Sequence, residues 1–455
     1  MAEVFSAAMT RPARPDHIDI GVFTGAVGPL RRRCPLCRSP PSAGAQLLRC
    51  SACRAVHYCS PEHQAAHRPQ HKLACTTIKK ARSRLAKEEH DVRNAEPDPD
   101  TPENAFETDV GGFWLLESTR QYMTARNSLA RFLCSVGTLD SVKESLEHLL
   151  DMMRLSREDN IGARYLVPSI MLRLDLDQEC YDFMKWWLVD AEDEDYDWDD
   201  MTEPFLDVHG ADVLEDPRPL LKKNPELSFV SALLILNLKL LVDIRNIKVT
   251  RKVLSRRQDL PYELLDQIER EAVRSPLSLK FQRQSPECLI ETEKTILKNI
   301  RELGSTLNEI SSVFLPNLFY ADIVLSVRPV TYTRGTLEET ALVLQDSYAT
   351  WWETEGVIRL LQDANSIVVK DLKDPFTYKE KFDEAQKALG LKCARLTWMY
   401  LDWACEDAAY LGPSSERPSE RHIEKKKKAE QKAAEVVVEE EDTKASDEEA
   451  WTDDE

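Results

Sequence analysis

The chain has 455 residues, of which 42% are hydrophobic and 31% charged, and its formal net charge is −19. At about 100 to 200 residues per domain, this length predicts two or three folded units. So acidic a balance argues against a protein that binds nucleic acid with its whole surface, because phosphate affinity depends on clustered Lys and Arg. Only 14 glycines leave few of the flexible turns that phosphate and cofactor loops require, so the composition favours helices.

The 11 cysteines are not distributed as in a disulfide framework. Six precede residue 76, and the rest are widely separated in apolar or helical stretches. The first ten residues lack a basic region followed by an apolar run, so no secretory signal is predicted. We therefore expect an intracellular protein, in the nucleus, the cytoplasm or both. The separated cysteines are Cys134, Cys180, Cys288, Cys393 and Cys405.

In chain order, residues 1–30 show little pattern and are predicted to be disordered. The cysteine-rich segment follows, at residues 31–76. Residues 77–110 are predicted as a charged helix and a linker, because three prolines stand among acidic residues between positions 96 and 102 and prevent a helix. We place a domain boundary there. It leads us to expect that the parts on either side melt separately.

Eight potential zinc ligands lie within residues 34–75, at the spacing Cys-x2-Cys-x12-Cys-x2-Cys-x5-Cys-x3-His-x7-His-x3-Cys. Zinc binds thiolates and imidazoles in a tetrahedron, and a two-residue gap lets one tight turn direct two thiolates at one ion. The two x3 pairs fit positions i and i+4 of a helix, where both side chains share a face. The four pairs could be assigned to two ions in several ways. The eight residues are Cys34, Cys37, Cys50, Cys53, Cys59, His63, His71 and Cys75.

The order of the four pairs resembles that of a cross-braced MYND finger. The local sequence agrees, with Tyr58-Cys59-Ser60, with Gln64 directly after the sixth ligand, and with His71-Lys72 before the last cysteine. By this resemblance, the first zinc is held by Cys34, Cys37, Cys59 and His63. The second is held by Cys50, Cys53, His71 and Cys75.

Two departures from the family pattern concern His63 and Arg68. The family usually has cysteine at the position of His63, and histidine is a permissible substitute. Many relatives have tryptophan at the position of Arg68, where it is implied to help form a peptide-binding surface. His57 and His67 are competing ligands, but neither keeps the family spacing.

With all eight ligands in use, neither zinc keeps an open position for an activated water, so both ions are predicted to be structural. A segment this small owes its fold largely to metal binding.

Residues 111–412 are predicted to form an α-helical domain. A capping box over residues 141–144 opens one helix, Ser285-Pro286 opens a second and the segment 336–339 a third. The most apolar stretch, residues 229–244, is interrupted by Asn237 and Lys239 and is shorter than the ~20 residues that span a bilayer, so it predicts a buried helix and no membrane contact. The pairs Trp186-Trp187 and Trp351-Trp352 are interpreted as packed core.

Two architectures fit the helical domain. Residues 141–190 are predicted as three short helices, separated at 156–160 and at 175–177, which resembles a tetratricopeptide-like array. No clean 34-residue repeat is present, so an irregular helical bundle is the alternative. Segments within residues 162–213 also resemble the helical region of fungal MYND-finger proteins of unassigned role.

An acidic loop at residues 190–200 contains eight acids together with Tyr196 and Trp198. It is interpreted as a solvated loop, and the sharper hypothesis is a contact for a basic partner.

These observations predict a zinc-binding adaptor for protein partners, in particular for proline-containing peptides, and not an enzyme. The first alternative is a nucleic-acid-binding regulator that uses the arginines around the cysteine cluster. The second is a SET-type lysine methyltransferase, whose Asn-His segment, glycine-bearing cofactor loop and further cysteine cluster are not found in the sequence. The arginines of the first alternative are Arg31, Arg32, Arg33, Arg38, Arg49 and Arg54.

Residues 413–455 are predicted to be a disordered charged tail, because they contain 15 acidic and 8 basic residues and a single aromatic, Trp451. Deleting residues 414–455 should leave the melting temperature of the protein unchanged, since the tail has no apolar face to bury. Thermal denaturation followed by circular dichroism checks this. A fall of several degrees would show that the tail docks on the folded part.

Overall fold

The computed structural model describes residues 29–37, 46–98, 102–223, 225–257, 260–319, 321, 324–325, 327, 329, 331–358 and 360–361. The predictions for most of residues 1–30, for the end of the helical domain with Cys393 and Cys405, and for the tail at 413–455 lie outside the described residues.

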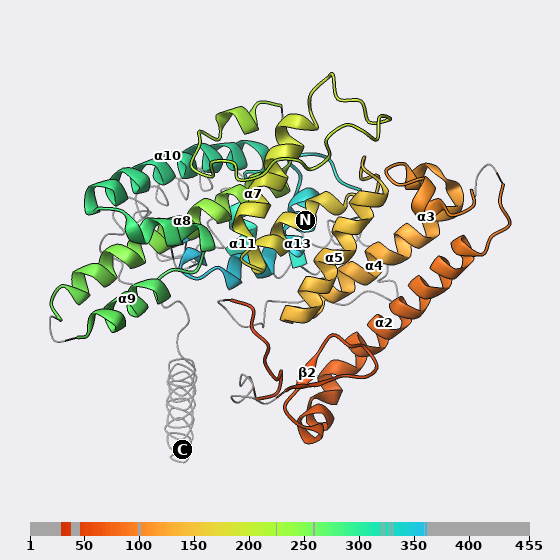
Figure 1. Cartoon of the computed structure of the whole chain (residues 1–455), viewed down its shortest axis with the longest axis horizontal. Coiled ribbons are helices and arrows are strands. Elements are labelled where there is room, and N and C mark those ends of the chain that lie inside the picture. Colours follow the sequence, from red (N-terminus) through yellow and green to blue (C-terminus); the bar gives the residue numbers. More distant parts are fainter. Residues whose placement is uncertain are drawn as a thin grey trace, which may run out of the picture. The chain divides into compact units, whose positions relative to one another are not determined.

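The described part is mainly α-helical, as predicted (Figure 1). The one sheet among the described residues is a two-stranded antiparallel ladder of β1 (Leu48–Arg49) and β2 (His57–Tyr58), in which Leu48 faces Tyr58. It is followed by α2 (Pro61–Arg93), which runs without a break from the predicted finger into the predicted charged helix.

Further helices follow α2 along the chain. They are α3 (Ala105–Thr108), α4 (Arg120–Val136), α5 (Leu139–Leu155), α6 (Val167–Arg173), α7 (Asp177–Lys185), α8 (Leu227–Leu254), α9 (Tyr262–Glu271), α10 (Pro286–Ile310), α11 (Phe314–Phe319) and α13 (Leu337–Glu353). Short helical turns lie between them. These are η1 (Phe113–Leu115), η2 (Glu117–Thr119), η3 (Ala163–Tyr165), the π-helical turn η4 (Trp186–Asp190), η5 (Arg218–Leu221) and η6 (Pro276–Arg283).

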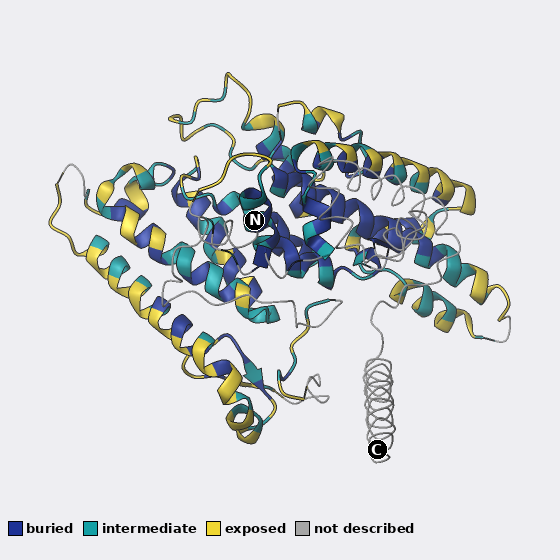
Figure 2. Ribbon diagram, turned by 180° about the vertical axis from the view of Figure 1, so that it is seen from behind, coloured by how far each residue is buried: buried dark blue, intermediate teal, exposed yellow. Residues whose placement is uncertain are grey.

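Helix α8 is the centre of the core. It packs against α10, α13, α6, α9 and α7, and Figure 2 shows the buried residues gathered around it. The sequence argument from length is wrong, because α8 has 28 residues and could cross a membrane by length and composition. The predicted burial is confirmed, since the whole apolar window of α8 is buried inside the protein. In a repeat array each unit contacts only its neighbours. One helix that contacts five others therefore makes the described helices an irregular bundle.

Two of the three predicted helix starts are confirmed. Ser285 accepts a hydrogen bond from the N–H of Cys288 before α10, and Thr336 accepts one from Glu339 before α13. The capping box at residues 141–144 is wrong in register, because the cap of α5 is Thr138. Its hydroxyl accepts from the Ser141 N–H at 3.2 Å, and the Ser141 hydroxyl accepts from the Thr138 N–H at 3.0 Å.

The tryptophan pairs pack largely as predicted, with Trp186, Trp187 and Trp351 buried. The aromatic residues of the acidic loop pack on the first pair. The Tyr196 ring lies 5.7 Å from that of Trp186, and the Trp198 ring is stacked 6.0 Å from that of Trp187. These rings hold the loop on η4, while its eight acids are exposed to solvent.

The lysine that interrupts the apolar helix α8 belongs to a buried ion network. Lys239 is 2% exposed, and its Nζ donates to Asp175 at 2.6 Å and to Asp177 at 2.8 Å. Arg274 also donates to Asp175, at 2.9 Å. The carboxylates at the α6–α7 connection are thus tied to α8 and to the segment just before η6. A charge buried this deeply is tolerated because it is paired.

Replacing Lys239 with methionine should lower the free energy of unfolding by about 3 to 5 kcal/mol, because the apolar stem is kept while the buried Asp177 loses its partner. The matched control is Lys294→Met, which breaks an exposed ion pair with Glu291. That change should cost less than about 1 kcal/mol. Urea denaturation of both variants measures the difference, and equal losses would contradict the importance of the buried pair.

Candidate metal centre

The first cluster joins a turn to the start of α2. Cys34 and Cys37 come from the turn, Cys59 precedes the helix, and His63 lies in its first turn. The helix starts here because the Ser60 hydroxyl accepts from the His63 N–H at 3.3 Å and proline, which lacks a donor, takes the first helical position. Of the predicted i, i+4 helical pair, only the histidine is therefore within the helix.

The second cluster joins the β-hairpin to the same helix. Cys50 and Cys53 flank the turn that follows β1, and His71 and Cys75 stand one helical turn apart on the face of α2 that looks towards it. In each cluster the four ligand atoms lie within 4.8 Å of one another. The structure therefore brings together the two sets of four that the resemblance implied.

Most of the distances within the clusters fit zinc. Around one tetrahedral ion, two sulfurs should be about 3.8 Å apart, and a sulfur and a nitrogen about 3.6 Å. The Sγ atoms of Cys50 and Cys75 are 3.8 Å apart, and those of Cys37 and Cys59 are 3.6 Å apart. The measured sulfur–nitrogen distances are 3.6 Å for Cys34–His63, 3.3 Å for Cys53–His71 and 2.7 Å for Cys59–His63. The Cys59–His63 distance is too short for a shared ion, so these two side chains must move apart to bind zinc.

The two clusters differ in burial. All four ligands of the second are buried, whereas Cys37 and Cys59 of the first are exposed and His63 is half-buried. With four protein ligands each, both are closed structural sites. The chain thus carries two sites for structural zinc, each formed by three cysteines and one histidine.

The electrostatics of the second cluster also call for a cation. Burial raises the pKa of the Cys53 thiol to about 12, with the neighbouring Cys50 and Cys75 acting in the same direction and the Ala55 N–H opposing them. Burial lowers the pKa of His71 to about 4, so its imidazole is neutral and free to bind a metal. Without a metal the Cys53 thiol is therefore protonated at neutral pH, and metal binding must displace this proton.

The two competing histidines have other partners. His57 Nδ1 lies 3.3 Å from Asp140 of α5, and His67 Nδ1 lies 3.0 Å from the Tyr58 hydroxyl. The ring of His67 is also stacked 5.7 Å from that of His71. Neither belongs to a ligand cluster. His67 thus packs on a ligand from outside, and His57 contacts α5.

The comparison with known families agrees with this geometry. The family model described as MYND finger matches residues 33–75. This segment is a MYND zinc finger. No curated protein and no solved structure matches the chain. These comparisons assign no role to the helical bundle, and what they show about function concerns residues 33–75 alone.

Several arginines around the MYND finger are engaged by the helical bundle. Arg32 forms a two-pronged ion pair with Asp140 of α5, and Arg82 forms another with Glu144. Arg49 lies 4.0 Å from the same glutamate. Two of the six arginines seen in the sequence, Arg32 and Arg49, thus contact acidic residues of α5 together with Arg82 of α2, and the ligand spacing gives no sign of these partners.

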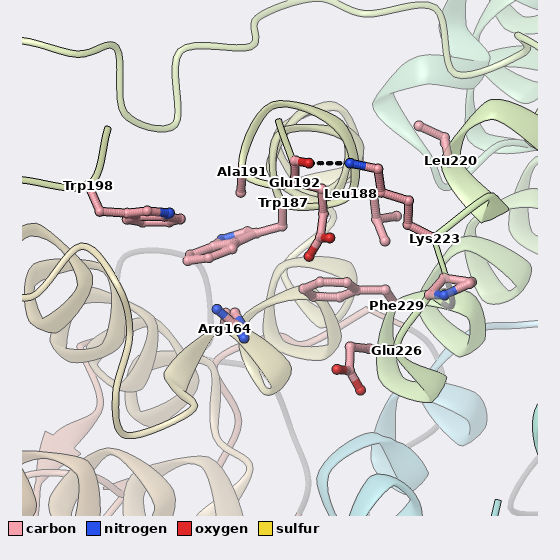
Figure 3. Close-up of a pocket in the computed structure, with 11 residues that line it drawn as sticks. Arg164, Trp187, Leu188, Ala191, Glu192, Trp198, Leu220, Lys223, Glu226 and Phe229 are labelled. Atoms are coloured by element: carbon pink, nitrogen blue, oxygen red, sulfur yellow. Dashed lines mark hydrogen bonds between the residues drawn. The ribbon is translucent and has the colours of Figure 1, made fainter. Parts of the chain in front are cut away.

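A separate cavity of about 270 Å³ lies beside η4 (Figure 3). Trp187 and Phe229 line it, and the Arg164 guanidinium lies 4.5 Å from the centre of the Trp187 ring. Lys223 and Glu226 add charges of opposite sign to its lining.

Among the described residues, the only groups that could hold a metal ion are the two clusters of the finger.

Purified, reduced protein should carry two zinc ions per chain, because two complete ligand sets are present. Cys53→Ser should lower the content to about one, since it removes a ligand of the buried site. Cys288→Ser, which changes an exposed cysteine outside both clusters, is the matched control and should keep two. Elemental analysis decides, and one ion or none in the wild type would contradict the two-site assignment.

Proposed function

We propose that the protein is an intracellular, non-catalytic adaptor whose MYND finger binds an extended peptide of a partner while the helical bundle acts as a scaffold. MYND fingers are protein–protein interaction domains. The observation that carries the proposal is the closure of both zinc sites by four protein ligands each. Ions held in this way shape a surface and leave no position for substrate chemistry.

The surface that we assign to the peptide lies around β1 and the first turns of α2. Leu48 of β1 is 48% exposed although it belongs to the hairpin, and an extended peptide can add to such a strand. Gln64 and Arg68 are one helical turn apart on α2, and Arg68 is exposed. An arginine in place of tryptophan supplies a cation instead of a ring. We therefore propose proline-containing peptides that carry an acidic residue.

Charge pairing weighs against the nucleic-acid alternative. Arg32 and Arg82 are paired with acids of α5, which reduces the positive charge that the finger presents to phosphates. Titration of duplex and single-stranded DNA at low salt tests this alternative. We expect no binding, and an affinity that falls steeply with added salt would favour it instead.

The test of the peptide surface uses the full chain and an array of extended peptides, with and without proline and with and without an acidic residue. Leu48→Asp and Arg68→Glu should each weaken binding at least about tenfold, because they place negative charge on the proposed surface. Lys87→Glu, at an exposed position farther along α2, should bind like the wild type. Zinc content should stay at two in all variants. Equal binding by all four proteins would refute the proposed surface.

A further inference from the structure

The MYND finger and the helical bundle share one apolar cluster. Leu129 and Leu133 of α4 are 1% and 0% exposed, and they pack in the same cluster as the second-site ligands Cys50, Cys53 and Cys75. Helix α2, which carries the other ligand of that site, lies along α4 (Figure 1). The buried zinc site therefore sits at the boundary between the two parts.

The backbone that presents Cys53 to the metal is hydrogen-bonded on both sides. We call residues 53–55 the knuckle. The Ala55 N–H donates to Cys53 Sγ at 3.4 Å, and the Ala55 carbonyl accepts from the Thr138 hydroxyl at 2.6 Å. The Cys53 carbonyl accepts from Arg82 Nε at 3.0 Å. Because Thr138 also caps α5, one hydroxyl links the knuckle to the start of that helix.

An ion pair between Arg82 and Glu144 extends the contact between the knuckle and α5. Arg82 binds the knuckle with one nitrogen and Glu144 with the others, at 2.8 Å for the Nη2–Oε2 pair. Burial alone would raise the pKa of Glu144, but Arg82 holds it below its usual value, so the glutamate is charged. The side chain of Arg82 is only 15% exposed. An ion pair this sheltered holds its partners in fixed positions.

From these contacts we propose that zinc binding at the buried site couples the MYND finger energetically to the helical bundle. Zinc at this site fixes the knuckle, and the knuckle fixes Thr138, Arg82 and the start of α5. Loss of this ion loosens α4 and α5, although neither helix contributes a ligand. By reciprocity, the contacts from α5 raise the zinc affinity of the site. The structure thus leads to the opposite expectation from the proline-rich linker, which predicts separate melting.

The two zinc sites provide a matched comparison. The first site has two exposed thiols, and its connection to α5 runs through the side chains of Arg32 and His57. At the second site, by contrast, Thr138 and Arg82 bind the backbone carbonyls of the knuckle itself. Losing the first ion should therefore disturb the bundle much less than losing the second. The variants Cys37→Ser and Cys53→Ser remove one thiol from each site.

Amide hydrogen exchange of the full chain is the first measurement. In Cys53→Ser, exchange in α5 and in the facing part of α4 should rise at least about tenfold over the wild type, whether or not other helices follow. In Cys37→Ser, the same helices should stay within about threefold of the wild type. Unchanged exchange in Cys53→Ser, or an equal rise in both variants, would overturn the proposal.

Zinc release tests the reciprocal effect and does not require the loss of a ligand. The background is Cys37→Ser, in which the second site keeps its four ligands. Adding Glu144→Gln or Thr138→Val should lower the zinc affinity of the second site about tenfold, measured by competition with a chelator. Glu147→Gln, at an exposed position of α5, is the control and should release zinc like the background protein. Equal affinities in all of these proteins would show that α5 does not support the site.

Discussion

Zinc coordination at the buried second site is the interaction on which the MYND finger depends. Residues 33–75 contain a hairpin of two residues per strand, two cysteine-bearing turns and the first part of α2, which bury too little apolar surface to fold alone. The metal supplies the missing stabilisation because it binds Cys50, Cys53, His71 and Cys75 only when hairpin and helix have their native positions. The shape of the finger surface follows from this site.

The site also explains why α2 is long. Its first half carries three of the eight ligands, and its second half packs along α4 with Ile78 and Ala81 buried. A single helix thereby transmits the geometry of the zinc sites to the bundle. The acidic face of α5 then fixes the rotation of the finger through Arg32 and Arg82. Arg32 and Arg49, two of the arginines that suggest a nucleic-acid site in the sequence, contact acids of α5 instead.

Within the bundle, a buried polar contact likewise fixes the orientation of α8. This apolar helix is long enough to cross a bilayer, but it is surrounded by other helices, and Lys239 pairs with two aspartates at the α6–α7 connection. The pairing selects one rotation of α8 about its axis, because only that rotation brings the Lys239 ammonium to Asp177. Apolar residues all around the helix would not select a rotation by themselves.

The sequence by itself determined the eight candidate ligands, since Cys-x2-Cys turns and x3 pairs are local geometry. Spacing left their assignment to the two ions open, and the resemblance to MYND fingers implied the two sets that the structure brings together. It also determined the mainly helical class, the helix starts at Ser285 and Thr336, and the burial of α8, because caps and hydrophobic runs act over a few residues. The cap of α5 was misplaced by three residues, since Thr138 and Ser141 both carry hydroxyls that can cap. The tertiary structure alone decided that Thr138, Asp140 and Glu144 meet the finger. Each contact joins residues 62 to 108 positions apart, namely Arg82–Glu144, Thr138–Ala55 and Arg32–Asp140, and no local pattern encodes a contact over that separation.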